Sequence, residues 1–278
     1  MAISSMLVPI GLDERDHKVL KYVCGLGVQS VRRVLVATSV KIEGLEAPVI
    51  PAEVDRARER LALMAASLKP CHMAIEWRVV TGEPSESLLA LAQQADVDVI
   101  CCGTEGKSLV DYLFSGSVSE DIFASGRMRT MTVRYDLLDA ADDPGELGQD
   151  FGKRLVVPVD FSASSTRAFL SAFDRPASAM EKLFIIHVVP EDATEDDKMQ
   201  AEVLIKGQLA IAREHGVDCQ VDVRHGDPEE AVLAYLDEVD ATGVITGIRG
   251  KGVLRGVVVG SLSLRLLRDA PCPVVVQP

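Results

Sequence analysis

A glycine pattern occurs twice in this chain of 278 residues, with the same spacing each time. The two copies comprise Gly103, Gly106, Gly116 and Ser117, then Gly247, Gly250, Gly260 and Ser261. Corresponding residues lie 144 positions apart throughout. Each copy follows an apolar run and precedes a helical pattern, so it is typical of a glycine loop that presents phosphate to a helix N-terminus. A repeat of this kind indicates an internal duplication.

The duplication extends beyond the glycine loops. Gly82-Glu83-Pro84 matches Gly226-Asp227-Pro228 at the same offset, and residues 6–10 match residues 155–159 at an offset of 149. The length suits two domains that each bury their own core. We therefore expect a first domain at 1–138, an acidic linker at 139–151 with the boundary near Gly148, and a second domain at 152–278.

Short apolar runs alternate with longer helical patterns in both halves. In the second half the predicted strands are 154–159, 182–189, 219–224, 241–246 and 273–276. Helices are predicted near 162–173, 195–215, 228–238 and 261–269. Because the strands are apolar on both faces, the pattern predicts an α/β fold with a parallel sheet covered by helices on both sides.

Composition excludes several classes of partner. The net charge of −13 argues against nucleic acid or an anionic membrane, since both require a basic face. No apolar run approaches the roughly 20 residues of a membrane span, and no export signal is visible, so we expect a cytoplasmic protein. The six cysteines and five histidines show no metal-ligand spacing, and the cysteine pattern suits a reduced setting.

With these motifs placed, the chain resembles a tandem universal stress protein. In the second half the matching segments are Val157-Pro158-Val159-Asp160, Ile186-His187-Val188, Gly226-Asp227-Pro228, Thr246-Gly247-Ile248-Arg249-Gly250, Gly260-Ser261-Leu262-Ser263 and Ala270-Pro271-Cys272-Pro273-Val274-Val275-Val276. The resemblance implies two Rossmann-like domains, similar to adenine nucleotide alpha hydrolases, each with a five-stranded parallel sheet of order 3-2-1-4-5. Nucleotide would lie between the ends of strands 1 and 4, where the strand order reverses.

The family's ligand-binding roles can be carried over to matching positions. In the second domain they fall on Pro158, Asp160, Val188, Gly247, Arg249, Gly250, Gly260, Ser261, Leu262 and Ser263. In the first domain the weaker candidates are Gly103, Gly106, Gly116, Ser117 and Ser119. The first domain departs from the family pattern, with Gly11 at the position of Asp160, Thr38 at that of His187, and no Pro-Cys-Pro in 127–132.

Charge separates the two loops. The window 103–124 carries Lys107 against four acids, Glu105, Asp111, Glu120 and Asp121, a net charge of −3. The window 247–268 carries five cations and no acid: Arg249, Lys251, Arg255, Arg265 and Arg268. A triphosphate is therefore expected to prefer the second loop.

Three side chains allow alternative roles. Ser261 and Ser263 suit either helix capping or phosphate binding, and His187 suits a packed core position or a ligand contact. Asp227 is expected to cap the helix that begins at Pro228.

The leading functional hypothesis is a sensor or signalling module that binds ATP, with or without Mg²⁺, and whose liganded state is read by another protein. The alternatives are a weak ATPase, an enzyme that phosphorylates one of its own loop serines, such as Ser261, and a scaffold without nucleotide. The resemblance also implies an intramolecular pseudo-dimer through 128–135 and 273–277, with homodimerisation as a further option.

Overall fold

The chain forms two compact units in a computed structural model. The structure describes residues 3–27, 31–42, 44, 49–67, 72–105, 118–174, 176–191, 193–250 and 259–278. Among these residues, the first unit comprises 3–105 and 118–149, and the second begins at Asp150.

In the first unit the strands are β1 (Ser5–Pro9), β2 (Arg33–Val40), β3 (Ala74–Thr81), β4 (Val99–Thr104) and β5 (Thr130–Arg134). The helices are α1 (Glu14–Leu26), α2 (Ile50–Ser67), α3 (Pro84–Gln94), α5 (Val118–Ser125), α6 (Tyr135–Ala140) and α7 (Pro144–Asp150). Buried side chains that include Leu7, Leu35, Leu88 and Ile100 form one core cluster between the sheet and its helices.

In the second unit the strands are β6 (Arg154–Pro158), β7 (Lys182–Val189), β8 (Cys219–His225), β9 (Gly243–Gly247) and β10 (Val274–Gln277). The helices are α8 (Ala163–Ser171), α9 (Glu195–Glu214), α10 (Pro228–Glu238) and α11 (Ser261–Asp269), with short 3₁₀ turns at Ala172–Asp174 and Ala177–Ala179. The predicted elements of this half are confirmed, with bounds that differ by about two residues.

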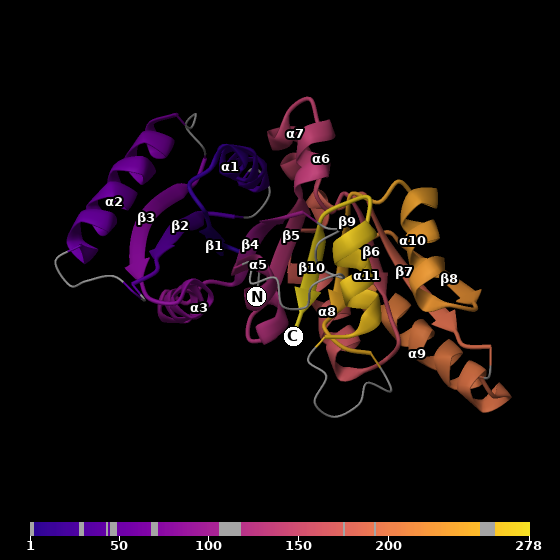
Figure 1. Cartoon of the computed structure of the whole chain (residues 1–278). Helices are drawn as coiled ribbons and strands as arrows, with labels where there is room; N and C mark the ends of the chain where they lie inside the picture. Colours follow the sequence, from indigo (N-terminus) through magenta and orange to yellow (C-terminus); the bar gives the residue numbers. More distant parts are fainter. Residues whose placement is uncertain are drawn as a thin grey trace. The chain divides into compact units, whose positions relative to one another are not determined.

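Each unit contains a parallel sheet of order 3-2-1-4-5. The order is β3-β2-β1-β4-β5 in the first unit and β8-β7-β6-β9-β10 in the second. Helices α1 and α2 cover one face of the first sheet, and α3 and α5 cover the other (Figure 1). The predicted fold class is confirmed. The strand order reverses between β6 and β9, so the carboxyl ends of these two strands border a crevice.

The helix starts follow from local chemistry. Asp227 caps α10, since its side chain accepts hydrogen bonds of 2.9 Å from the backbone N–H groups of Glu229 and Glu230, as predicted. Thr194 and Asp197 form a capping box at the start of α9, and Ser162 caps α8. Satisfying the first N–H groups of a helix stabilises it by about 1 kcal/mol per cap.

The segment that the sequence suggests as an acidic linker is folded. It contains the end of α6 and all of α7. Helix α7 packs on α1 so closely that a Cβ on Gly148 would lie 2.0 Å from the carbonyl oxygen of Tyr22. Only glycine permits this approach of two backbones. Residues 139–149 therefore belong to the first compact unit.

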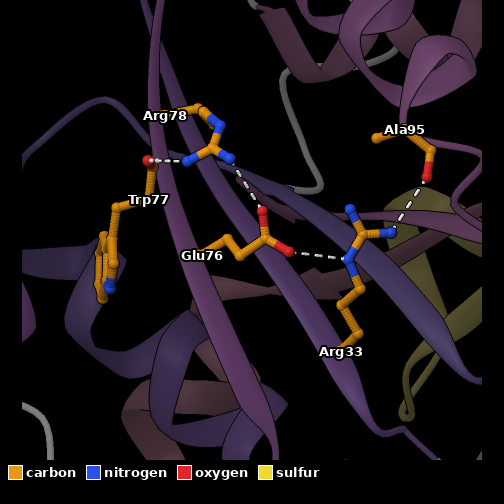
Figure 2. A network of polar contacts seen from close by, with 5 residues as sticks. All are labelled: Arg33, Glu76, Trp77, Arg78 and Ala95. Atoms are coloured by element: carbon orange, nitrogen blue, oxygen red, sulfur yellow. Dashed lines mark hydrogen bonds and ion pairs between the residues drawn. The ribbon is translucent and has the colours of Figure 1, made fainter.

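A polar network joins β2, the edge strand β3 and the end of α3 in the first unit (Figure 2). Arg33 of β2 donates to Glu76 of β3 at 3.0 Å and to the carbonyl of Ala95, the C-cap of α3, at 3.1 Å. Arg78 donates to the second oxygen of Glu76, also at 3.0 Å. Charges on an edge strand oppose pairing with another chain, and a cation at a helix C-terminus stabilises the helix.

The cysteines differ in state. Cys24 is joined in a disulfide, which the cysteine pattern does not predict, whereas Cys101, Cys102, Cys219 and Cys272 are free. Burial raises the pKa of Cys102 to about 12 and raises that of Cys101 well above its usual range. Because the thiolate is the reactive species, this pair within β4 has the character of buried core residues.

Candidate functional site

One cavity of about 540 Å³ opens at the carboxyl ends of β6 and β9 in the second unit. Its wall contains every position that the sequence predicts for nucleotide binding in this unit: Pro158, Asp160, Val188, Gly247, Arg249, Gly250, Gly260, Ser261, Leu262 and Ser263. The N-terminal turns of α9 and α10 complete the wall with Asp197, Gln200, Asp227 and Glu229. The topology therefore gathers residues that are up to 105 positions apart, from Pro158 to Ser263.

The N-terminus of α11 faces this cavity without a side-chain cap. Gly260 is the N-cap residue and has no side chain to accept the first N–H groups. The first turn of α11 carries no acid, and Ser261 is exposed. Uncapped N–H groups and the positive end of the helix dipole together form an anion-binding surface.

Neither serine of this turn caps α11, so the capping alternative is wrong for both. Ser263 is 2 % exposed, and its hydroxyl donates to the carbonyl of Gly247 at 2.8 Å. Ser119 makes the corresponding bond to Gly103 at 3.1 Å in the first unit. The shared contact ties the helix after the glycine loop to the strand before it.

Two aromatic rings also lie on the cavity wall, and the sequence interpretation missed one of them, Phe161. His187, for which the sequence allowed either a core position or a ligand contact, lines the cavity half-buried and donates from Nδ1 to the carbonyl of Val159 at 2.7 Å. Phe161 also lines the cavity, at a positive φ of 61°, with its ring 4.8 Å from that of His187. Leu12 holds the matching position in the first unit at φ 66°, so this strained backbone belongs to the shared fold.

The α8 serines contact the glycine loop directly. Ser164 donates from Oγ to the carbonyl oxygen of Arg249, and Ser162 donates to the same oxygen at 3.3 Å. The run of serines after strand 1, Ser162, Ser164 and Ser165, was the available signal in the sequence.

Ion pairs change the predicted charge balance of the two loops. Arg265 and Arg268 both pair with Asp269, one residue beyond the window that was compared, at 3.0 and 2.8 Å. Lys251 and Arg255 lie outside the described residues. Among the cations of this window that the structure describes, Arg249 is the one on the cavity wall. Among the described residues, the contrast with the first loop is therefore smaller than residue counting suggests, and Arg249 is its main source.

The counterpart region of the first unit is arranged differently. Glu105, at the position of Arg249, forms an ion pair with Arg15 of α1. The Arg15 guanidinium also lies 5.2 Å from the centre of the Tyr135 ring, which packs against Gly103. Of the candidates in this unit, Gly106, Gly116 and Ser117 lie outside the described residues.

A buried acid lies beside this group. Asp16 of α1 is 4 % exposed and accepts a hydrogen bond of 2.9 Å from the backbone N–H of Asp13. Burial is the main cause that raises the pKa of Asp16 to about 6, and the charge of Asp13 adds to it. Burial and the neighbouring Asp16 likewise raise the pKa of Tyr135 to about 12.

We expect Asp16→Asn to remove a pH dependence of stability. Since the pKa of Asp16 is higher in the folded than in the unfolded chain, the wild-type protein loses stability as pH rises from about 4 to 6. Relative to the variant, this loss reaches roughly 3 kcal/mol at pH 7. Urea unfolding of both proteins at pH 4 and pH 7 measures it. Asp142→Asn, at an exposed position, is the control, and a difference between wild type and Asp16→Asn that is constant with pH would contradict the prediction.

Comparison with known proteins shows what the chain is similar to. The model of the Universal stress protein family matches residues 3–134 and again residues 152–278. The crystal structure of a universal stress protein from Archaeoglobus fulgidus DSM 4304 is 25% identical. The match covers 99% of this chain and 96% of that one, with a TM-score of 0.76. The similarity thus extends over both units.

Other relatives are shorter, and each matches a stretch of this chain about as long as one of its two units. A putative universal stress protein of Staphylococcus aureus strain USA300, SAUSA300_1656, is 30% identical over 137 residues, which are 45% of this chain and 82% of the relative. A universal stress protein family protein of Arabidopsis thaliana, solved with AMP bound, is 22% identical over 45% of this chain and 90% of its own, with a TM-score of 0.35. No helix in the described part of the chain is long and apolar enough to cross a membrane.

Proposed function

The chain belongs to the universal stress protein family, with two copies of the family's domain in tandem, and from this premise we propose that it binds an adenine nucleotide, ATP, in the cavity of its second unit. The main support for this proposal is that all ten positions taken from the family pattern line this cavity. Its volume of about 540 Å³ lies within the range of pockets for small-molecule ligands.

The chemistry of the wall supports one orientation of the ligand. Phosphates meet uncapped N–H groups at the start of α11 and the exposed side chain of Arg249. The base meets the apolar ends of β6 and β7, where Pro158 and Val188 line the cavity. The acids Asp197 and Asp227 lie in the wall at the starts of α9 and α10, and they would repel phosphates from that side.

The cavity favours binding over hydrolysis. Phosphoryl transfer to water requires a group that positions the water, together with stabilisation of the transferred charge. Three of the four acids on the wall instead accept hydrogen bonds from backbone N–H groups: Asp160 from Ser162 at 2.9 Å, Asp197 from Thr194 at 3.0 Å, and Asp227 from Glu229 and Glu230. The role that follows is that of a nucleotide-responsive module whose liganded state is recognised by a partner protein. Pairing of the last strands of the two domains remains part of this proposal.

Identifying the nucleotide carried by the purified protein tests this function. The protein is denatured, and any released compound is identified by mass and quantified per chain. The proposal predicts an adenine nucleotide at about one per chain, or saturation at that ratio when ATP is added to an empty preparation. Two per chain would contradict the single site, and failure to bind added ATP would leave a scaffold as the better account.

A further inference from the structure

Three backbone and side-chain contacts hold the glycine loop of the second unit at Arg249. The hydroxyls of Ser162 and Ser164 both donate to its carbonyl oxygen, and its N–H donates to the Oγ of Ser164 at 3.4 Å. Ser164 is 6 % exposed, so its hydroxyl cannot exchange this partner for water without an energetic cost. We call Ser162 and Ser164 the serine clamp.

The duplication provides an internal comparison. Ser162 and Ser164 correspond to Asp13 and Arg15, and Arg249 corresponds to Glu105, by the offsets of 149 and 144 residues. Both units therefore join the start of the helix that follows the first strand, α1 or α8, to the loop that follows the fourth strand, β4 or β9. The first unit makes this connection with two side chains, because the Arg15 guanidinium pairs with the Glu105 carboxylate. The second unit makes it with the backbone of Arg249.

The backbone connection at Arg249 affects how the second unit can bind its ligand. Because the serine clamp holds the carbonyl and N–H of Arg249, the start of the loop is held through its backbone, and Arg249 lies exposed on the cavity wall. Building on the proposed function, we infer that the serine clamp is a positioning device that holds the glycine loop at the place where Arg249 and the N-terminus of α11 meet the phosphates. Pre-positioned donors bind an anion without the entropic cost of ordering a loop.

The test separates phosphate binding from binding of the nucleoside. Ser164→Ala removes one donor without adding bulk, and it does not alter the N-cap of α8, which is Ser162. We expect ATP to bind about tenfold more weakly and adenosine to bind within about twofold of the wild type. Ser171→Ala is the matched control: Ser171 is another buried serine of α8, and its hydroxyl donates at 2.7 Å to the carbonyl of Ala168 within the helix. It should leave both affinities unchanged.

Calorimetric titration with ATP and with adenosine, together with the melting temperature of each free protein, distinguishes the outcomes. Unchanged ATP affinity in Ser164→Ala would overturn the positioning role, as would parallel losses for ATP and adenosine, which indicate a general structural role. Wild-type protein that binds neither ligand would instead overturn the proposed function itself. Ser162→Ala is the second variant, in which the same ligand selectivity should appear with a smaller change because its bond to the carbonyl oxygen is longer. Loss of the α8 cap should in addition lower the melting temperature of this variant.

Discussion

Replacing Gly250 with leucine is expected to lower ATP affinity on the order of 100-fold. Gly250 lies on the cavity wall, and even a Cβ at this position would lie 2.8 Å from the Oδ2 atom of Asp160. A leucine must therefore displace the Asp160 carboxylate and occupy space on the wall that the ligand requires. Both residues are among those that the family pattern assigns to the nucleotide. Calorimetric titration with ATP measures the effect.

A control of the same size separates this effect from a general loss of stability. Gly207 is exposed in α9 and has no atom within 4 Å of the place where a Cβ would be. Gly207→Leu should therefore bind ATP like the wild type, and leucine is also the better helix former. Gly250→Leu with an affinity within threefold of the wild type, or a melting temperature that falls far below that of Gly207→Leu, would contradict the assignment of Gly250 to the ligand site.

Reversing the charge of Arg249 is the second large change. Arg249→Glu gives the second loop the residue that Glu105 provides in the first loop. The serine clamp holds the backbone of this residue, so the loop should keep its place. Loss of an attractive charge and gain of a repulsive one near the phosphates should weaken ATP binding roughly 30-fold, or about 2 kcal/mol.

The number of phosphates and the salt concentration test the electrostatic origin of that loss. AMP carries less charge than ATP, so its affinity should fall less, and the deficit for ATP should shrink at high salt because ions screen exposed charges. Lys206→Glu, on an exposed part of α9, changes the net charge equally and should leave both affinities near wild type. Equal losses for AMP and ATP would show that Arg249 does not face the β- and γ-phosphates, and a loss independent of salt would contradict its electrostatic origin.

The strands were predictable because each leaves a clear pattern, and their order was predicted from the resemblance to the universal stress protein family. Buried parallel strands are continuous apolar runs, and β4 and β9 are buried at every position. The glycine loop and the Gly226-Asp227-Pro228 turn follow these strands at recognisable spacing. Once the strand order was known, the convergence of Asp160, Gly247 and Ser263 on one crevice followed from the topology.

The features that the sequence did not predict depend on contacts between distant or unexpected partners. Ser164 and Arg249 are 85 residues apart, and no periodicity relates a hydroxyl to a backbone carbonyl at that distance along the chain. The acidic segment before Asp150 has the composition of a linker, yet the close approach of α7 to Tyr22 folds it onto α1. Charge counts within a window also omit partners that lie outside it, such as Asp269 and Arg15.

A crystal structure of the full chain with ATP tests the central claim most directly. The account predicts one nucleotide per chain in the second-unit cavity, with its phosphates at the N-terminus of α11 beside Arg249 and its base near Pro158 and Val188. A nucleotide bound in the first unit, or one in the second cavity with its base at α11, would contradict that claim.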